Sequence, residues 1–168
     1  MTEDYGGLVG AFPYAFRASD SRLFRSYVVV GTVATAAVTL LFVTALVGVI
    51  AATSGGRGGS LTLSRSFFAV VGLFVVVPLV TPVLLVARRH RRAGSTDRYD
   101  AALATTGYLF LLSLYVGLVI SVPPGQQTTP AGPLAPVVAV LYALPQYAGV
   151  VPPLVATALV GVCHRLLR

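Results

Sequence analysis

Hydrophobic and polar positions in this chain form long blocks, unlike the short alternation of a surface helix or a strand. Four apolar blocks contain no Asp, Glu, Arg, Lys or His, and they cover residues 27–52, 67–87, 101–122 and 136–162. Each is long enough to cross a hydrocarbon layer of ~30 Å as a helix, which takes roughly 20 residues. The pattern predicts an all-α fold, a four-helix transmembrane bundle.

These blocks divide the chain into three parts. We expect residues 1–26 to be a cytoplasmic or interfacial segment, residues 27–163 the four-span domain, and residues 164–168 a basic cytoplasmic tail. The first block is longer than the roughly 7–15 apolar residues of a signal-peptide core, and acidic residues precede it. It is therefore predicted to be a retained anchor.

Arginine is distributed unequally between the two sides of the predicted bundle. The N-terminal segment, the connection 88–98 and the tail hold ten of the twelve basic residues, all arginine, and the connection between spans one and two holds the other two. An excess of arginine in short flanks marks the cytoplasmic side. Both termini and the connection 88–98 are thus predicted to be cytoplasmic.

Capping residues mark the predicted helix starts. Asp20 or Ser21 can cap an N-terminal extension of span one, and Ser64 can cap span two. Asp97, with Asp100 three residues later, resembles a capping box for span three.

The aromatic residues ahead of span one leave two interpretations open. In a helix, Phe12, Phe16, Leu23 and Tyr27 would share one face, as in a short helix lying in the interface. Alternatively, the segment is an ordered turn whose aromatic rings rest on headgroups. Tyr27 and Tyr99 are expected to act as interfacial anchors where spans one and three enter the membrane.

Prolines fall in the second and fourth spans. Span two contains Pro78 and Pro82, and span four contains Pro145, Pro152 and Pro153. Each removes a backbone donor and crowds the preceding turn, so we expect both spans to be kinked. Interrupted helices at matching places in two halves are also typical of transport sites.

A polar group within the spans is the candidate intramembrane site: Gln146, Tyr147, Tyr142 and Tyr115. Lipid satisfies none of the hydrogen-bonding groups of Gln146, so its side chain is expected to turn into the bundle. There it would either bond a carbonyl released by the proline or line a cavity.

The most basic run of the chain follows span two. Arg88, Arg89, Arg91 and Arg92 are predicted to set the topology and to contact anionic lipid headgroups or an acidic partner. His90 lies between these cations, which makes it a poor metal ligand.

Composition argues against several other functions. The chain has no Lys, no Asn and a single cysteine, Cys163, which excludes an internal disulfide and a Cys-x-x-Cys redox motif. The net charge of +7 comes from arginines beside apolar runs, so we expect lipid contact and no nucleic acid. No catalytic, cofactor or metal site is predicted, because no base lies within the spans.

The N-terminal run Tyr5-Gly-Gly-Leu, then Gly10-Ala-Phe-Pro-Tyr-Ala-Phe and residues 17–27, resembles a family of small multi-pass membrane proteins from halophilic archaea, labelled as a domain of unknown function. The resemblance implies an archaeal plasma membrane and supplies no activity.

Two functions lead, with a membrane enzyme as a third possibility. The leading one is a non-enzymatic scaffold or subunit of a membrane assembly, with the lipid bilayer, its anionic headgroups, and a second copy or another membrane protein as partners. The alternative is a small oligomeric transporter or channel with a polar site near Gln146.

Overall fold

The computed structural model describes residues 7–54 and 59–167, and within these residues it is helical without strands. The described residues form six α-helices and two short 3₁₀ helices, in the order α1 (Gly7–Ala18), α2 (Arg22–Thr53), α3 (Gly59–Arg92), α4 (Asp97–Ile120), η1 (Pro124–Gln126), α5 (Ala135–Tyr142), η2 (Gln146–Val150) and α6 (Val151–Leu167). The all-α prediction is confirmed.

In the described part of the chain, four helical stretches are long and apolar enough to cross a membrane: Arg22–Thr53, Leu63–Arg92, Asp97–Ile120 and Gln146–Leu167. The first three contain most of the predicted spans, with polar residues lengthening them at the ends. The fourth begins ten residues later than the apolar block 136–162.

The block 136–162 is divided because Pro145 interrupts it. Pro145 has an extended backbone, φ −64° and ψ 138°, between the end of α5 and the start of η2. Pro152 and Pro153 lie in the first turn of α6, where a missing N–H costs little. By contrast α3 continues as one helix through Pro78 and Pro82.

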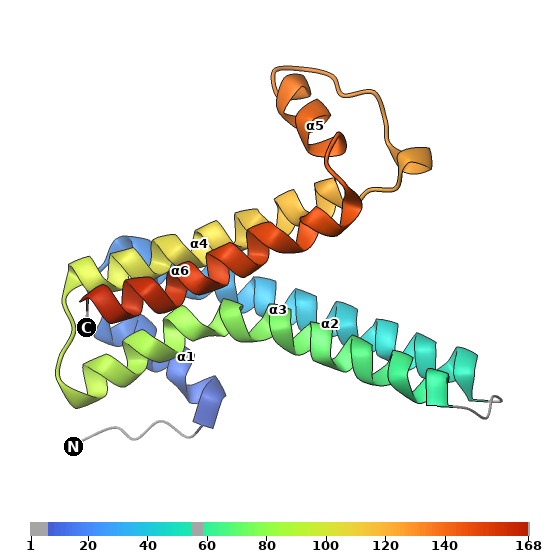
Figure 1. Cartoon of the computed structure of the whole chain (residues 1–168). Helices are drawn as coiled ribbons and strands as arrows, with labels where there is room; N and C mark the ends of the chain where they lie inside the picture. The colour runs from blue at the N-terminus through green and yellow to red at the C-terminus, as the bar shows by residue number, and fades with distance from the viewer. Residues whose placement is uncertain (1–6, 55–58, 168) are drawn as a thin grey trace.

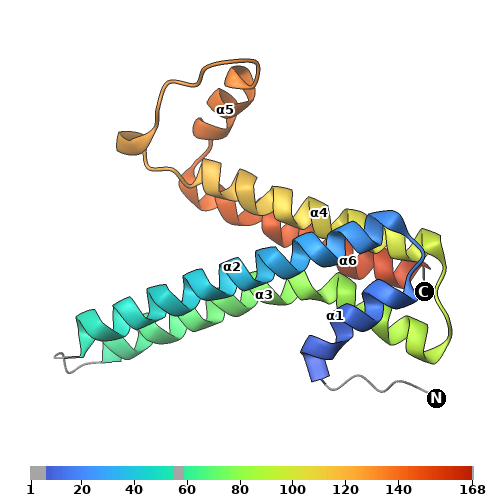
Figure 2. The same cartoon turned by 180° about the vertical axis from the view of Figure 1, so that it is seen from behind.

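The four long helices form two antiparallel pairs, α2 with α3 and α4 with α6 (Figures 1 and 2). The α1–α2 turn, the last turn of α6 and the α3–α4 connection lie at the same end of the molecule. From that end the two pairs diverge, and α5 lies beyond the far end of α4 (Figure 1). The arginine-rich segments are thus gathered at one end.

The buried core also lies toward that end. Its members come from the first turns of α2 and α4 and the last turns of α3 and α6, with α1 beside them: Ala11, Ala15, Phe24, Tyr27, Val28, Val83, Val86, Ala87, Tyr99, Leu103, Ala104 and Val160. A smaller cluster of Leu79, Phe110 and Ala156 continues it. Beyond these clusters, many large apolar side chains are exposed, as in helices that face lipid.

The N-terminal segment forms a helix that packs on the bundle. Ala11 and Ala15 lie one turn apart on α1, and both are fully buried. The opposite side is open, since Val9 is 85% exposed. The Ser19–Ser21 turn then reverses the chain into α2, so the interpretation as a turn without a helix is wrong.

The helix caps agree only in part with the sequence. Ser21 caps α2, because its hydroxyl accepts from the amide of Phe24, as predicted. Thr96, not Asp97, caps α4 by accepting from the amide of Tyr99. Ser64 is no cap, since α3 begins at Gly59 and Ser64 lies inside it.

The expectation that Tyr27 and Tyr99 anchor the bundle at the interface is wrong, because their side chains are 0% and 1% exposed. Both helices start about a turn earlier than the apolar blocks, at polar caps. The two rings therefore lie inside the bundle, and Tyr27 donates its hydroxyl hydrogen to the Leu79 carbonyl at 2.7 Å.

Candidate functional site

The start of α4 presents two adjacent side chains to different neighbours. Successive helical residues point about 100° apart. Tyr99 therefore faces the ends of α3 and α6, while Asp100 faces the α1–α2 turn and another side of α3. Two polar groups result, one on each side of α4.

Asp100 is the centre of the first group, which we call the Asp100 cluster: Asp100, Ser19, His90 and Ser95. The carboxylate is fully buried. Ser19 Oγ donates to Oδ2 at 2.6 Å, and Ser95 Oγ donates to Oδ1 at 2.6 Å. His90 Nε2 lies 2.8 Å from Oδ2, and because a carboxylate only accepts, this contact places a proton on Nε2.

The α1–α2 turn is fixed at the same place. The Ser21 amide donates to Ser19 Oγ at 3.3 Å, and Arg25 Nε donates to the Ser19 carbonyl at 2.7 Å. Arg25 also lies 3.6 Å from the exposed Asp20. Ser19 is thus held on both its hydroxyl and its carbonyl.

The chemistry of this cluster is that of an interhelical contact. A nucleophilic serine donates to an imidazole or another base in the usual arrangement. Here Ser19 and Ser95 both donate to the carboxylate, which His90 also contacts. Within the described parts of the chain, no three His, Cys, Asp or Glu residues gather in a way that could hold a metal.

Tyr99 organises the second group. Its hydroxyl lies 2.7 Å from His164 Nδ1 on α6. The guanidinium of Arg89 lies over the Tyr99 ring, 4.1 Å from the centroid, and donates to the Leu167 carbonyl at 2.6 Å. One buried ring therefore positions a cation and an imidazole from two other helices.

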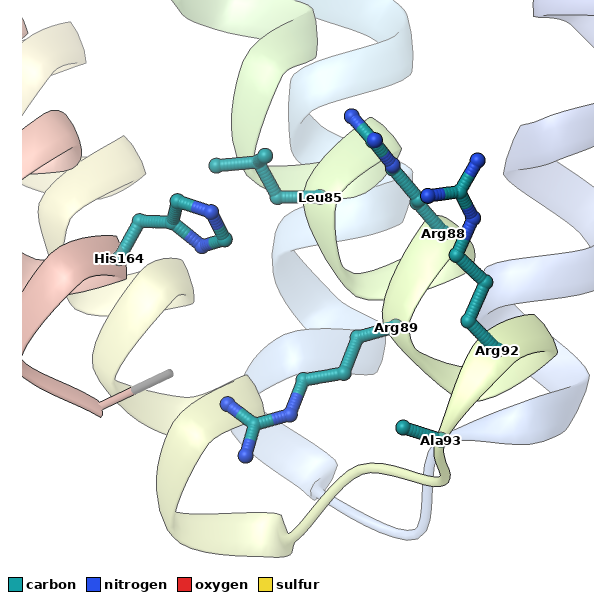
Figure 3. Close-up of a pocket in the computed structure, with 6 residues that line it drawn as sticks. All are labelled: Leu85, Arg88, Arg89, Arg92, Ala93 and His164. Atoms are coloured by element: carbon teal, nitrogen blue, oxygen red, sulfur yellow. The ribbon is translucent and has the colours of Figure 1, made fainter.

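A pocket of about 400 Å³ opens beside this group (Figure 3). We call it the arginine-lined pocket; its lining is Leu85, Arg88, Arg89, Arg92, Ala93 and His164. The first four residues recur at i, i+3, i+4 and i+7, which is one face of α3. His164 approaches from α6, and Figure 3 shows its ring directed toward the α3 side.

The structure thus brings three of the four predicted arginines into one pocket. Arg88, Arg89 and Arg92 line it, and Arg91 does not. Among the described residues, neither Arg88 nor Arg92 has a side-chain hydrogen bond or an ion pair.

The predicted intramembrane group is not assembled. Tyr115 is 65% exposed and Tyr147 is 81% exposed, and Tyr142 is half-buried on α5. Gln146 is exposed as well, so the expectation that it turns into the bundle is wrong. Because Pro145 ends the helix, Gln146 starts η2 near the end of α4, where Ser121 Oγ lies 3.5 Å from its backbone carbonyl.

Sequence reasoning missed the Asp100 cluster and the role of Tyr99, although signals existed. Asp100 shares a heptad spacing with buried positions of α4, namely Leu103, Gly107, Phe110 and Gly117. His90 likewise extends the buried face of α3 formed by Val83, Val86 and Ala87. Those registers place both side chains toward the core.

Comparisons with known proteins identify the family of this chain. Neither the curated proteins nor the solved structures give a match. One family model matches residues 1–168, the whole chain. The chain therefore belongs to the family described as domain of unknown function DUF8056.

Proposed function

We propose that this chain is a non-enzymatic integral membrane protein that serves as a scaffold or subunit of a membrane assembly. It crosses the membrane four times, with both termini and residues 88–98 in the cytoplasm. Pro78 and Pro82 bend α3, and the arginines at the cytoplasmic end contact anionic headgroups. The location is the archaeal plasma membrane, and the N-terminal resemblance supports this part of the proposal.

The observation that carries this proposal is the divergence of the two helix pairs (Figures 1 and 2). Away from the shared core, large side chains of α2 and α3 stay open: Leu40 is 65% exposed, Leu41 63%, Leu73 61% and Phe74 68%. The hydrophobic effect does not drive helices together in lipid, so close packing and polar contacts determine which helices associate. A separated pair can accept a helix of another protein.

The polar interior groups support a structural role. Ser19, His90 and Ser95 all contact Asp100, and Tyr27 bonds a carbonyl of α3. These contacts join segments far apart in sequence. Such groups stabilise the end at which the helices meet.

Affinity purification in mild detergent tests the proposal. We expect a second membrane protein, or further copies of the chain, at a constant molar ratio in mass spectrometry and light scattering. Gly48→Phe should reduce this recovery, because a Cβ at Gly48 meets nothing within 4 Å apart from its own helical turn, and an added ring there would extend into the space that the partner would occupy.

Gly161→Phe is the matched control. Gly161 also has open space around its Cβ position, but it lies on α6 near the shared core end. This variant should keep the partner. A wild-type chain that purifies alone and monomeric overturns the subunit role.

A further inference from the structure

We propose that the arginine-lined pocket holds the phosphate group of one anionic phospholipid. This inference rests on the proposed membrane location of the chain. It adds a defined, single-lipid site to the general attraction between arginines and headgroups.

Arg88 and Arg92 supply the binding groups. They lie one turn apart on the same face of α3, and within the described residues their guanidinium groups have no side-chain partner. Guanidinium groups match phosphate oxygens with two parallel N–H donors, which makes arginine pairs strong phosphate ligands.

Arg89 and Tyr99 shape the wall of the pocket. The last carbonyls of α6 carry partial negative charge, which would disfavour a phosphate. Arg89 donates to the Leu167 carbonyl at 2.6 Å and so counters this charge. Its position is fixed by stacking on the buried Tyr99 ring, so little side-chain entropy is lost when a ligand arrives.

The apolar part of the pocket lining favours a lipid over a free phosphate ion. Leu85 lies one turn deeper than Arg88 and Arg89 on the same helix face, within the apolar block 67–87. A phosphate held by the arginines would therefore have apolar helix surface directly below it. Acyl chains attached to that phosphate can follow this surface into the hydrocarbon.

Native mass spectrometry of the purified chain tests the site. The protein is delipidated in detergent, then exposed to mixed micelles of phosphatidylcholine with phosphatidylglycerol. We expect one phosphatidylglycerol to remain per chain, and at least a tenfold weaker retention in the double variant Arg88→Gln/Arg92→Gln.

The matched control is Arg17→Gln/Arg22→Gln, which removes the same charge from exposed positions of α1 and α2. It should retain the lipid like the wild type. Equal loss in both double variants would mean diffuse attraction and overturn a defined site, as would equal retention in both. If the pocket variant fails to fold, retention of phosphatidylcholine as well as phosphatidylglycerol by the wild type overturns the proposal on its own.

Two further arms separate the alternatives. Excess inorganic phosphate should leave the lipid bound; displacement of the lipid by phosphate would assign the site to free phosphate. Resistance of the chain to alkaline extraction from vesicles tests membrane integration separately. An extractable chain would sink the proposed function, whereas a resistant chain without retained lipid would sink only the lipid site.

Discussion

Asp100 illustrates how one buried carboxylate can determine which segments meet. Removing an ionised carboxylate from water costs several kcal/mol unless it is paired and hydrogen-bonded. Its partners come from the α1–α2 turn, the end of α3 and the α3–α4 connection. Any arrangement that separates these segments leaves the charge unpaired, so the cluster selects the observed one.

Replacing Asp100 by Ala should strongly destabilise the protein. The change leaves the buried Ser19 hydroxyl without its acceptor, at about 1–3 kcal/mol for an unsatisfied buried group, and also removes the contacts of the half-buried Ser95 and His90. Thermal unfolding in detergent measures the loss. Asp97→Ala is the control, because Asp97 is exposed in the same helical turn and offers only a dipole interaction of about 0.3–1 kcal/mol. Similar shifts for both variants would contradict the structural role of the cluster.

Gly107 is the second residue on which close packing depends. A Cβ at this position would overlap the ring of Tyr27. That ring is fully buried and bonded to the Leu79 carbonyl, so it has little room to move.

We therefore expect Gly107→Ala to lower the unfolding temperature, with a cost of about 1–3 kcal/mol as in other overpacked cores. Gly48→Ala is the matched substitution at a helical glycine with nothing within 4 Å. It should leave the unfolding temperature unchanged or raise it slightly. A Gly107→Ala protein as stable as Gly48→Ala would mean that Tyr27 can leave its position cheaply.

For single residues, the sequence predicts which side chains are buried better than it predicts which side chains they contact. Heptad spacing alone would place Asp100 and His90 toward the core. It does not pair Asp100 with Ser19, because the two residues are 81 positions apart and no local pattern reports that contact. The bounds of the apolar blocks also misplaced Tyr27 and Tyr99, because Tyr27 begins one block and Tyr99 lies just before another, while both helices start earlier.

At the scale of elements, α1 depends on small side chains at its contact with the bundle. Ala11 and Ala15 are both fully buried, so neither position has room for a larger side chain. Larger residues there would hold α1 away from α3.

The double variant Ala11→Leu/Ala15→Leu should therefore release α1, at a cost of about 1–3 kcal/mol per overpacked site. Limited trypsin digestion in detergent reports the release, because Arg17 and Arg22 flank the turn and are exposed. Cleavage there should become faster. Phe16→Ala, which alters a side chain that is 39% exposed, should change the rate much less. Unchanged cleavage of the double variant would show that α1 tolerates a looser fit.

The first three long helices were predictable because hydropathy and charge are local properties. The fourth apolar block was not correctly bounded, because apolar composition does not reveal where Pro145 ends a helix. The same break moved Gln146 from the middle of a predicted span to the start of η2 near the C-cap of α4. The Gln146 side chain is therefore exposed, although the apolar block 136–162 predicts that it lies within a span.

At the scale of the whole molecule, packing and charge coincide. The end that carries the buried core also carries the arginine-rich α3–α4 connection, the α1–α2 turn and the last turn of α6 (Figure 1). The opposite end is closed on α2 and α3 by Arg65, whose guanidinium bonds the Thr53 carbonyl at 3.1 Å and hydroxyl at 2.8 Å. One end is therefore suited to an anionic surface, whereas the described residues of the other end carry a single charged side chain, Arg65.

This asymmetry predicts the orientation in the membrane. Anionic lipids of the cytoplasmic leaflet attract arginines by about 1 kcal/mol each, so the end with residues 88–98 should stay inside. In a Cys163→Ser background, Gln126→Cys should react with a membrane-impermeant maleimide on intact cells. Ala93→Cys should react only after permeabilisation, and since both positions are exposed, accessibility within the protein does not limit either reaction. The reverse labelling would place the arginines outside and remove the basis for a cytoplasmic lipid contact.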